Sequence, residues 1–159
     1  MRVVVGSDHA GYPLKQELIP LLIKAGHEIH DVGTTSTEPV DYPDYAEATA
    51  NALLEGHGER AIVICGSGAG ACIAANKIRG IRCFQGNDTY TAHQAVEHDD
   101  ANMVALAARV TGGALAREIA ESFLGATFWD RGRYRARLDK VLAIEDRNFR
   151  TDRDSADRR

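Results

Sequence analysis

Residues 65–70 read Cys-Gly-Ser-Gly-Ala-Gly and bring a thiol, a hydroxyl and three glycines into one short corner of the sequence. The apolar run 61–64 predicts a strand buried on both faces, and the small residues 71–75 predict a helix after the corner. Glycines let a backbone approach a ligand closely, and successive amide N–H groups at a helix N-terminus can hold an anion or a developing oxyanion. Cys65 lies at the strand end, where the neighbouring helix favours a thiolate. This corner is the first candidate for an active site.

The same corner has two simpler interpretations. It is compatible with a plain tight turn, or with a phosphate-binding loop around an inert, buried cysteine. It lacks the GKS/T ending of a P-loop and does not match the GxGxxG pattern of dinucleotide-binding folds. The residues of the corner therefore leave a catalytic thiol and an anion cradle both open.

Acidic residues and histidines stand side by side at two other points of the chain. Asp8-His9 could orient and protonate a ligand, because histidine changes its charge near neutral pH. The alternative is that Asp8 caps the helix that follows and His9 is merely solvated. His98-Asp99 opens a polar turn, which fits either a proton shuttle or a solvated turn.

Arginines are concentrated near the C-terminus, with four of them in residues 131–137. Arg133 and Arg137 are four residues apart, so they share one face of a predicted helix and could grip one phosphate, whereas Arg135 points elsewhere. The alternative is a solvated basic face or salt bridges to acidic neighbours. Arg109, directly after a predicted strand, is a further isolated candidate.

Strands and helices alternate along the chain. The predicted strands are 2–6, 28–33, 61–65, 81–84 and 103–107, and the predicted helices are 12–25, 46–54, 71–77, 88–97, 114–123 and 134–144. Pro20 predicts a kink or a break in the first helix. The alternation indicates βαβ units, and therefore an α/β fold: a three-layer Rossmann-like sandwich with a five-stranded parallel sheet and an extra C-terminal helix.

In such a sheet, ligands bind at the carboxyl ends of the strands, near the point where the strand order reverses. Asp8-His9, Tyr42 and Cys65 follow three of the predicted strands and are expected at that edge, with Tyr42 lining a pocket or lying on its rim. His98 precedes strand 103–107 and is expected at the opposite edge. A second subunit would therefore have to supply His98 to the same pocket.

The composition is that of an ordinary globular protein. One domain is expected over residues 1–149, and the charged, apolar-poor residues 150–159 are expected to form a disordered tail. A net charge of −4 without a basic stripe gives no reason to expect nucleic acid, and no apolar run approaches the ~20 residues of a membrane span. Three cysteines, with no signal-peptide pattern and no Cys/His ligand spacing, argue for a reducing cytoplasm and against a disulfide framework or a zinc site.

Motifs spread along the chain resemble the type B ribose-5-phosphate isomerases, within the wider group that contains the galactose-6-phosphate isomerase subunits. The resemblance runs from residue 1 to about residue 147, and this spread makes it more specific than any single motif. The matching pieces are Gly6-Ser7-Asp8-His9-Ala10-Gly11, Asp41-Tyr42-Pro43, Ile64-Cys65-Gly66-Ser67-Gly68, Ala74-Ala75-Asn76-Lys77, Gly80-Ile81-Arg82, His98 with Asn102, Arg109, and Gly132-Arg133 with Arg137.

The resemblance implies an aldose–ketose isomerase of a phosphorylated sugar that needs no metal ion and no organic cofactor. The reaction implied most directly converts ribose 5-phosphate to ribulose 5-phosphate. Cys65 would be the base that moves a proton between C1 and C2, and Ser67 would assist proton movement between O1 and O2. The backbone amides of the corner would stabilise the cis-enediolate, namely those of Gly66, Gly68, Ala69 and Gly70.

Further roles implied by the resemblance lie outside the corner. Asp8 and His98 would act in ring opening and hydroxyl contacts. The phosphate would be held by His9, Arg109, Arg133 and Arg137. Because members of this family share each site between two subunits, the resemblance implies a homodimer, or a tetramer, and accounts for the expected position of His98.

Asp99 is a departure from the family pattern, which commonly has Asn after this histidine. A carboxylate can accept but cannot donate a hydrogen bond, and it adds negative charge near a phosphorylated substrate. Asp99 and Tyr42 are expected to contact the substrate, and the sugar itself stays open, with four- and six-carbon phosphosugars as alternatives. A non-catalytic phosphometabolite- or nucleotide-binding module is the rival class. A thiol-redox protein is a weaker third, because Cys72 is poorly placed to resolve Cys65.

Overall fold

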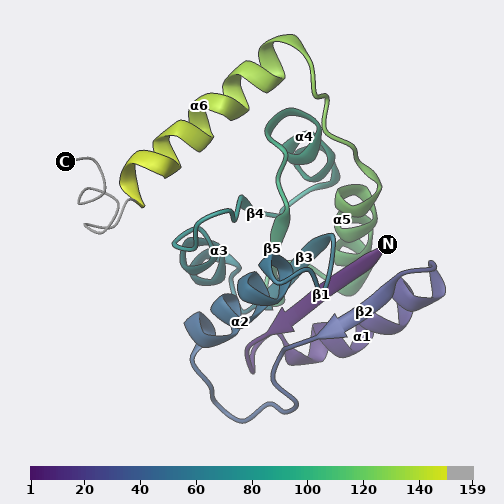
Figure 1. Ribbon diagram of the computed structural model, residues 1–159. Helices are drawn as coiled ribbons and strands as arrows, with labels where there is room; N and C mark the ends of the chain where they lie inside the picture. The colour runs from purple at the N-terminus through teal and green to yellow at the C-terminus, as the bar shows by residue number, and fades with distance from the viewer. Residues whose placement is uncertain (150–159) are drawn as a thin grey trace.

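The computed structural model describes residues 1–149, and strands and helices alternate through this range (Figure 1). The elements are β1 (Arg2–Ser7), α1 (Tyr12–Lys24), β2 (Glu28–Asp31), α2 (Tyr42–Leu54), β3 (Arg60–Cys65), α3 (Ala69–Ala75), β4 (Cys83–Gln85), α4 (Thr89–Asp99), β5 (Met103–Ala107), α5 (Gly113–Gly125) and α6 (Gly132–Asn148). The strands form one parallel sheet in the order β2-β1-β3-β5-β4. The predicted α/β fold with a five-stranded parallel sheet is confirmed.

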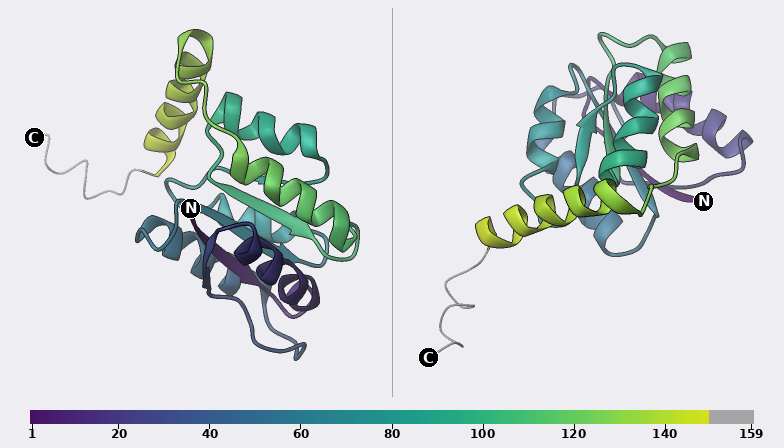
Figure 2. Two further views of the ribbon diagram at one scale, coloured as in Figure 1. Left: turned by 90° about the vertical axis from the view of Figure 1, so that its right-hand side faces the viewer. Right: turned by 90° about the horizontal axis from the view of Figure 1, so that it is seen from above.

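The sheet separates two hydrophobic cores. The right-hand view of Figure 2 shows helices on both faces of the sheet. Successive side chains of a strand point to opposite faces, so Val3 and Val5 of β1 pack toward α1, α4 and α5, while Val4 packs toward α2 and α3. The central strands β3 and β5 are buried on both faces, which explains why their sequences are continuous apolar runs rather than alternating ones.

Helix α6 lies outside both layers and extends away from the sheet (Figures 1 and 2). Leu138 is its buried residue, whereas Val141 and Ile144 are about half exposed. Its C-terminal half is tied to the loop before β4, because Glu145 accepts a hydrogen bond from the Gly80 amide at 2.8 Å and Asp146 pairs with Arg79 at 2.8 Å. None of the helices among residues 1–149 is long and apolar enough to cross a membrane.

Two local predictions are corrected, and a third is not tested. Helix α1 runs through Pro20 as one helix, because this proline lies on the exposed side, where a lost backbone hydrogen bond is exchanged for water. His98 and Asp99 belong to the last turn of α4 rather than to a loop, since the helix ends only at Asp100, in the left-handed conformation (φ 52°). The predicted tail 150–159 lies outside the described residues.

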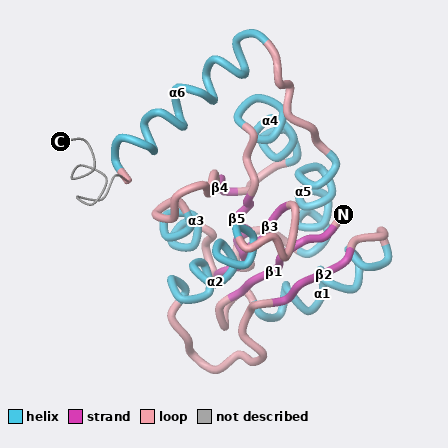
Figure 3. The backbone as a smooth tube through the Cα atoms, in the orientation of Figure 1, coloured by secondary structure: helices cyan, strands magenta, loops and turns pink. Residues whose placement is uncertain are grey.

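The strand order reverses between β1 and β3, which pair in parallel in the middle of the sheet. After β1 the chain continues to β2 on one side of the sheet, and after β3 it continues to β4 and β5 on the other side. Their carboxyl ends carry Asp8 and Cys65, so these two residues meet at the position where parallel sheets bind ligands. The long connection from β2 to α2, drawn as a loop in Figure 3, passes beside this position and leads to Tyr42.

Candidate active site

A cavity of about 290 Å³ lies at the carboxyl ends of the central strands. Four separate segments of the chain line it: the turns after β1, β3 and β5, and the start of α2. Most of these side chains were predicted from the sequence to share one site, whereas Ala10 and Val110 were not. The lining residues are Asp8, His9, Ala10, Tyr42, Cys65, Gly66, Ser67, Gly70, Arg109 and Val110.

Cys65 is the last residue of β3, and only 5% of its surface is exposed. Its Sγ accepts a hydrogen bond from the amide of Gly68, with N···S at 3.1 Å. Gly68 has φ +78°, a left-handed conformation that is natural for glycine and turns the amide back toward the sulfur. A donor aimed at the sulfur stabilises negative charge there, which is what a thiolate needs.

The glycine corner is held in place by the turn after β5 and by the last residue of β4. The carbonyl of Cys65 accepts from the Ala108 amide at 2.9 Å, and the carbonyl of Gly66 accepts from the Arg109 amide at 3.0 Å. Gln85, at the end of β4, donates from Nε2 to the carbonyl of Ser67 at 2.8 Å. Gln85 was not predicted as a site residue. The sequence indicated it only as a polar residue directly after the predicted strand 81–84.

Asp8 is buried, with 6% of its surface exposed, and its Oδ1 accepts a hydrogen bond from the Gly11 amide at 2.8 Å. The carboxylate therefore stabilises the turn before α1 and also lines the cavity, so the two interpretations of Asp8 apply together. Its Oδ2 has no hydrogen bond to any residue from 1 to 149 and is left for a ligand. Gly11 is required at this point, since a Cβ there would lie 2.1 Å from the carbonyl oxygen of Ile64.

The imidazole of His9 is oriented by the backbone of the β2–α2 connection. Nδ1 lies 3.1 Å from both the amide nitrogen and the carbonyl oxygen of Val40, so it is engaged with the main chain in either tautomer. Nε2 is consequently the ring atom that remains for a ligand. His9 is thus a positioned side chain rather than a freely solvated one.

Lys15 anchors the beginning of the same connection. Only 1% of its surface is exposed, and its Nζ donates to both carboxylate oxygens of Asp31 and to the carbonyl of Thr34, each at 2.8 Å. Lys15 shares the helix face of Leu18 and Leu22, at a spacing of three and seven residues. This ion pair was not predicted from the sequence. The available indication was a lysine on the apolar face of the helix.

Tyr42 and Arg109 form the open side of the cavity. Tyr42 is 44% exposed, and its ring packs over Gly70, where a Cβ would come within 2.8 Å of the ring. Arg109 is exposed, and its guanidinium carbon would be 3.5 Å from a Cβ at Gly66, so the side chain covers the corner. No acidic partner of Arg109 is found in residues 1–149, which leaves a free cation at the mouth of the cavity.

Two of the other predicted residues, Gly68 and Ala69, belong to the glycine corner but do not line the cavity. The remaining four lie at the α4–α6 end of the molecule, and none of them lines the Cys65 cavity: His98, Asp99, Arg133 and Arg137. The ring of His98 packs against Trp129 and Tyr134, with centroid separations of 5.0 and 4.6 Å. The guanidinium of Arg133 lies over the Tyr134 ring at 5.1 Å and donates to its hydroxyl at 3.0 Å. This hydrogen bond raises the pKa of Arg133, which stays fully charged.

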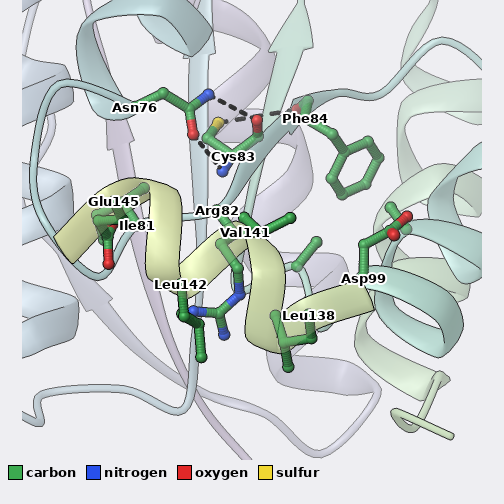
Figure 4. Close-up of a pocket in the computed structure, with 12 residues that line it drawn as sticks. Asn76, Ile81, Arg82, Cys83, Phe84, Asp99, Leu138, Val141, Leu142 and Glu145 are labelled. Atoms are coloured by element: carbon green, nitrogen blue, oxygen red, sulfur yellow. Dashed lines mark hydrogen bonds between the residues drawn. The ribbon is translucent and has the colours of Figure 1, made fainter. Parts of the chain in front are cut away.

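Arg135 and Arg137 differ in their ion pairs. Arg135 forms an ion pair with Asp130 at 2.5 Å, whereas the exposed Arg137 has no such pair within the described chain. Asp99 lines a different cavity, of about 300 Å³, between α6 and the body of the protein (Figure 4). Its neighbours there include Leu138 and Phe84, so within one chain Asp99 is not close to Cys65.

Comparison with known proteins gives consistent matches over nearly the whole chain. Residues 3–141 match the protein family described as Ribose/Galactose Isomerase. Ribose-5-phosphate isomerase B of Escherichia coli (strain K12) is 40% identical over 146 residues, which are 92% of this chain and 97% of that protein. D-erythrulose-4-phosphate isomerase of Pectobacterium atrosepticum is 39% identical over 130 residues, 80% of this chain and 85% of that protein.

The fold comparison agrees with the sequence comparison. The structure of Clostridium thermocellum ribose-5-phosphate isomerase B superimposes with a TM-score of 0.89 at 44% sequence identity. The match covers 93% of this chain and 99% of that one. The family resemblance inferred from dispersed motifs is confirmed.

Proposed function

Because the chain belongs to the ribose/galactose isomerase family, we propose that it is a sugar-phosphate isomerase that interconverts ribose 5-phosphate and ribulose 5-phosphate. The observation that carries this proposal is the buried Cys65 sulfur, which receives the Gly68 amide at 3.1 Å inside a cavity that Asp8, His9 and Arg109 also line. A base, a set of amide donors and a free cation are the groups that such a reaction requires.

Cys65 acts as the base in this mechanism. Its thiolate removes the proton from C2 of the open-chain aldose, the C1 carbonyl oxygen takes up negative charge, and a cis-enediolate forms. Return of the proton to C1 gives the ketose, so the thiolate is regenerated and no net oxidation occurs. Ser67, whose hydroxyl has no hydrogen bond to the described chain, moves the proton between O1 and O2.

The backbone of residues 66–70 stabilises the enediolate through its amides other than that of Gly68, which is bound to the Cys65 sulfur. Its orientation is fixed beforehand, because three successive carbonyls, from Cys65 to Ser67, are already bound by β4 and the turn after β5. Preorganised amide donors need no rearrangement when charge develops on the sugar oxygens, and each contributes roughly 3 kcal/mol if it behaves like a typical oxyanion-hole donor.

Ring opening and phosphate binding use the rest of the cavity. The free Oδ2 of Asp8 accepts the proton of the anomeric hydroxyl while the bond from C1 to the ring oxygen breaks, and it returns this proton to the ring oxygen, which becomes a hydroxyl. Nε2 of His9 and the guanidinium of Arg109 bind the phosphate. Holding the phosphate at the mouth keeps C1 and C2 in register with Cys65, so binding energy from a remote group serves the reacting carbons.

A second copy of the chain completes the site in this proposal. His98, Arg133 and Arg137 are remote from the cavity of their own chain, whereas α6 extends outward with Val141 and Ile144 half exposed. A two-fold dimer would bring the α4–α6 end of each chain to the Cys65 cavity of the other. A reducing cytoplasm suits such an enzyme, whose three cysteines are all free thiols.

Isomerisation in D₂O tests the proposal. Ribose 5-phosphate incubated with the protein should yield ribulose 5-phosphate and incorporate deuterium at the transferred carbon position, as followed by ¹H NMR. A non-catalytic binding module would instead shift the sugar resonances without turnover or exchange, and that result would refute the proposal. Erythrose 4-phosphate belongs in the same series, because one relative is a D-erythrulose-4-phosphate isomerase and Asp99 departs from the common pattern. The larger kcat/KM identifies the substrate.

A further inference from the structure

Cys72 and Cys83 lie side by side, outside the proposed catalytic machinery. Cys72 belongs to α3 and Cys83 begins β4, and both are only partly buried. The Sγ of Cys72 lies 3.5 Å from the carbonyl oxygen of Cys83, so the Cys72 thiol is in direct contact with the second cysteine. This contact is not evident from the sequence, because the two cysteines are eleven positions apart along the chain.

Asn76 holds the two cysteines in this arrangement. Its side-chain amide donates to the carbonyls of Cys72 and Cys83, at 2.9 and 2.7 Å, and its Oδ1 accepts from the Cys83 amide at 2.9 Å. Figure 4 shows Asn76 above Cys83, joined to its backbone by these bonds. Cys83 also lines the 300 Å³ cavity beside α6, which gives small molecules a route to the pair.

The two thiols differ in acidity. The hydrogen bond with Cys83, supported by the Asn76 amide and opposed by burial, lowers the pKa of Cys72 to about 7. The same contact, together with burial, raises the pKa of Cys83. Near neutral pH the pair therefore holds a thiolate next to a thiol that keeps its proton. A partly exposed thiolate next to a second thiol is the arrangement found in reversible redox sites.

We propose that Cys72 and Cys83 are a redox-active dithiol that a hydroperoxide oxidises to an intrachain disulfide. The Cys72 thiolate attacks one peroxide oxygen, the O–O bond breaks, and Cys72 becomes a sulfenic acid. The Cys83 sulfur then displaces hydroxide from the Cys72 sulfur, and its proton leaves with the hydroxide as water. With hydrogen peroxide the balance is two thiols and one peroxide giving one disulfide and two waters. A dithiol reductant reverses the change.

The disulfide would act on the glycine corner from both sides. The Cys72 amide donates to the carbonyl of Gly68 at 3.0 Å, and Gln85, two residues after Cys83, holds the carbonyl of Ser67. A covalent bond that draws α3 and β4 together moves the supports of the amides that face the sugar oxygens. This part rests on the proposed function, and it predicts several-fold slower isomerisation in the oxidised protein.

Peptide mapping tests the disulfide without any isomerase assay. The Cys65→Ser variant is treated with hydrogen peroxide, blocked with N-ethylmaleimide and digested with trypsin without reduction. Peptide 61–77, which then contains only Cys72, should be joined to peptide 83–109. Reduction with dithiothreitol should separate the two peptides. Maleimide on both cysteines after peroxide treatment, or irreversible sulfinic acid in place of the cross-link, would overturn the proposal.

The Cys83→Ala variant is the matched control for the effect on turnover, because it keeps Cys65 and Cys72 but cannot form the bond. Wild type should lose turnover several-fold with peroxide and regain it with dithiothreitol, while Cys83→Ala keeps its rate. Equal loss in both proteins would assign the inhibition to Cys65 and overturn the regulatory part. If the reduced wild type isomerises none of the phosphosugars, the proposed function fails, and the peptide map still decides whether the dithiol exists.

Discussion

The Cys65 cavity and the α4–α6 end differ in how their polar side chains are held. In the cavity, backbone groups hold three of them: Gly68 donates to Cys65, Gly11 to Asp8, and Val40 engages His9. At the α4–α6 end, His98 lies in an aromatic stack and Arg137 has no ion pair within residues 1–149. The first region is preorganised within one chain, whereas the second offers unpaired charge at a surface, which only another molecule can use.

The largest effect should come from the preorganised region. Replacing Cys65 by Ser removes the proposed base but keeps the size of the side chain and the Gly68 donor. We expect kcat for ribose 5-phosphate to fall by roughly 10³-fold, since positioned acid–base groups typically contribute 10²–10⁴-fold. KM should change little, because the phosphate contacts remain. Steady-state kinetics measure both constants, with Cys83→Ala under reducing conditions as the control.

A wild-type rate in Cys65→Ser would contradict the assignment of the base. In that case the backbone-held side chains of the Cys65 cavity would not be the catalytic groups, and the contrast with the unpaired arginines at the α4–α6 end would have no meaning for catalysis. The deuterium exchange at the transferred carbon should disappear together with the turnover.

Gly11→Ala tests whether the rigidity of the cavity depends on close backbone packing. The new Cβ would lie 2.1 Å from the Ile64 carbonyl oxygen, so the turn after β1 must move away from β3. We expect the free energy of unfolding to fall by about 3 kcal/mol, at the upper end of typical overpacking costs. Urea denaturation measures this change. Gly112→Ala is the matched control, since nothing lies within 4 Å of its added Cβ.

Equal stability of the two alanine variants would show that the Asp8 turn is loose. In that case the contrast between a rigid cavity and a free α4–α6 end would no longer hold.

The Arg133→Ala/Arg137→Ala double variant addresses the second region. If these cations bind the phosphate of a substrate in the partner subunit, KM should rise by about 10-fold while kcat changes less, because charge-assisted contacts to a remote group mainly hold the substrate. The matched control is Arg135→Ala, whose guanidinium is already paired with Asp130. An unchanged KM in the double variant would exclude both arginines from the site.

Mixing two inactive proteins sharpens this test. Cys65→Ser and a His98→Asn/Arg137→Ala variant each lack one half of a shared site, but a mixed dimer has one site in which both halves are intact. Equimolar mixing after dissociation should restore about a quarter of the wild-type rate, the value for random pairing in a two-fold dimer. No recovery, with mixed dimers confirmed by native mass spectrometry, would mean that each site belongs to one chain.

The elements of the fold and the parallel direction of the strands could be predicted from the sequence, because they follow from local patterns. Apolar runs, glycine turns and the alternation of strands and helices identify the elements, and the carboxyl-end rule then brings Asp8 and Cys65 together. The contacts that hold the site could not be predicted in this way. Gln85 reaches Ser67, and Cys72 meets Cys83, only because β4 lies at the edge next to β5. Such pairings depend on strand order, which residue spacing does not encode.

The smallest expected effect is that of Asp99→Asn, which removes one negative charge from the α4–α6 end. Asp99 is exposed and forms no hydrogen bond with the described chain, so the fold should not change. If this end faces a phosphorylated substrate in the partner subunit, removing the charge should lower KM by about two-fold at low salt and less at high salt, since screening weakens exposed charges within about 10 Å. Glu118→Gln makes the same charge change on α5 and should leave KM as it is. A KM that changes equally in both variants, or in neither, would mean that Asp99 does not face the substrate, and the α4–α6 end would lose its proposed part in the site.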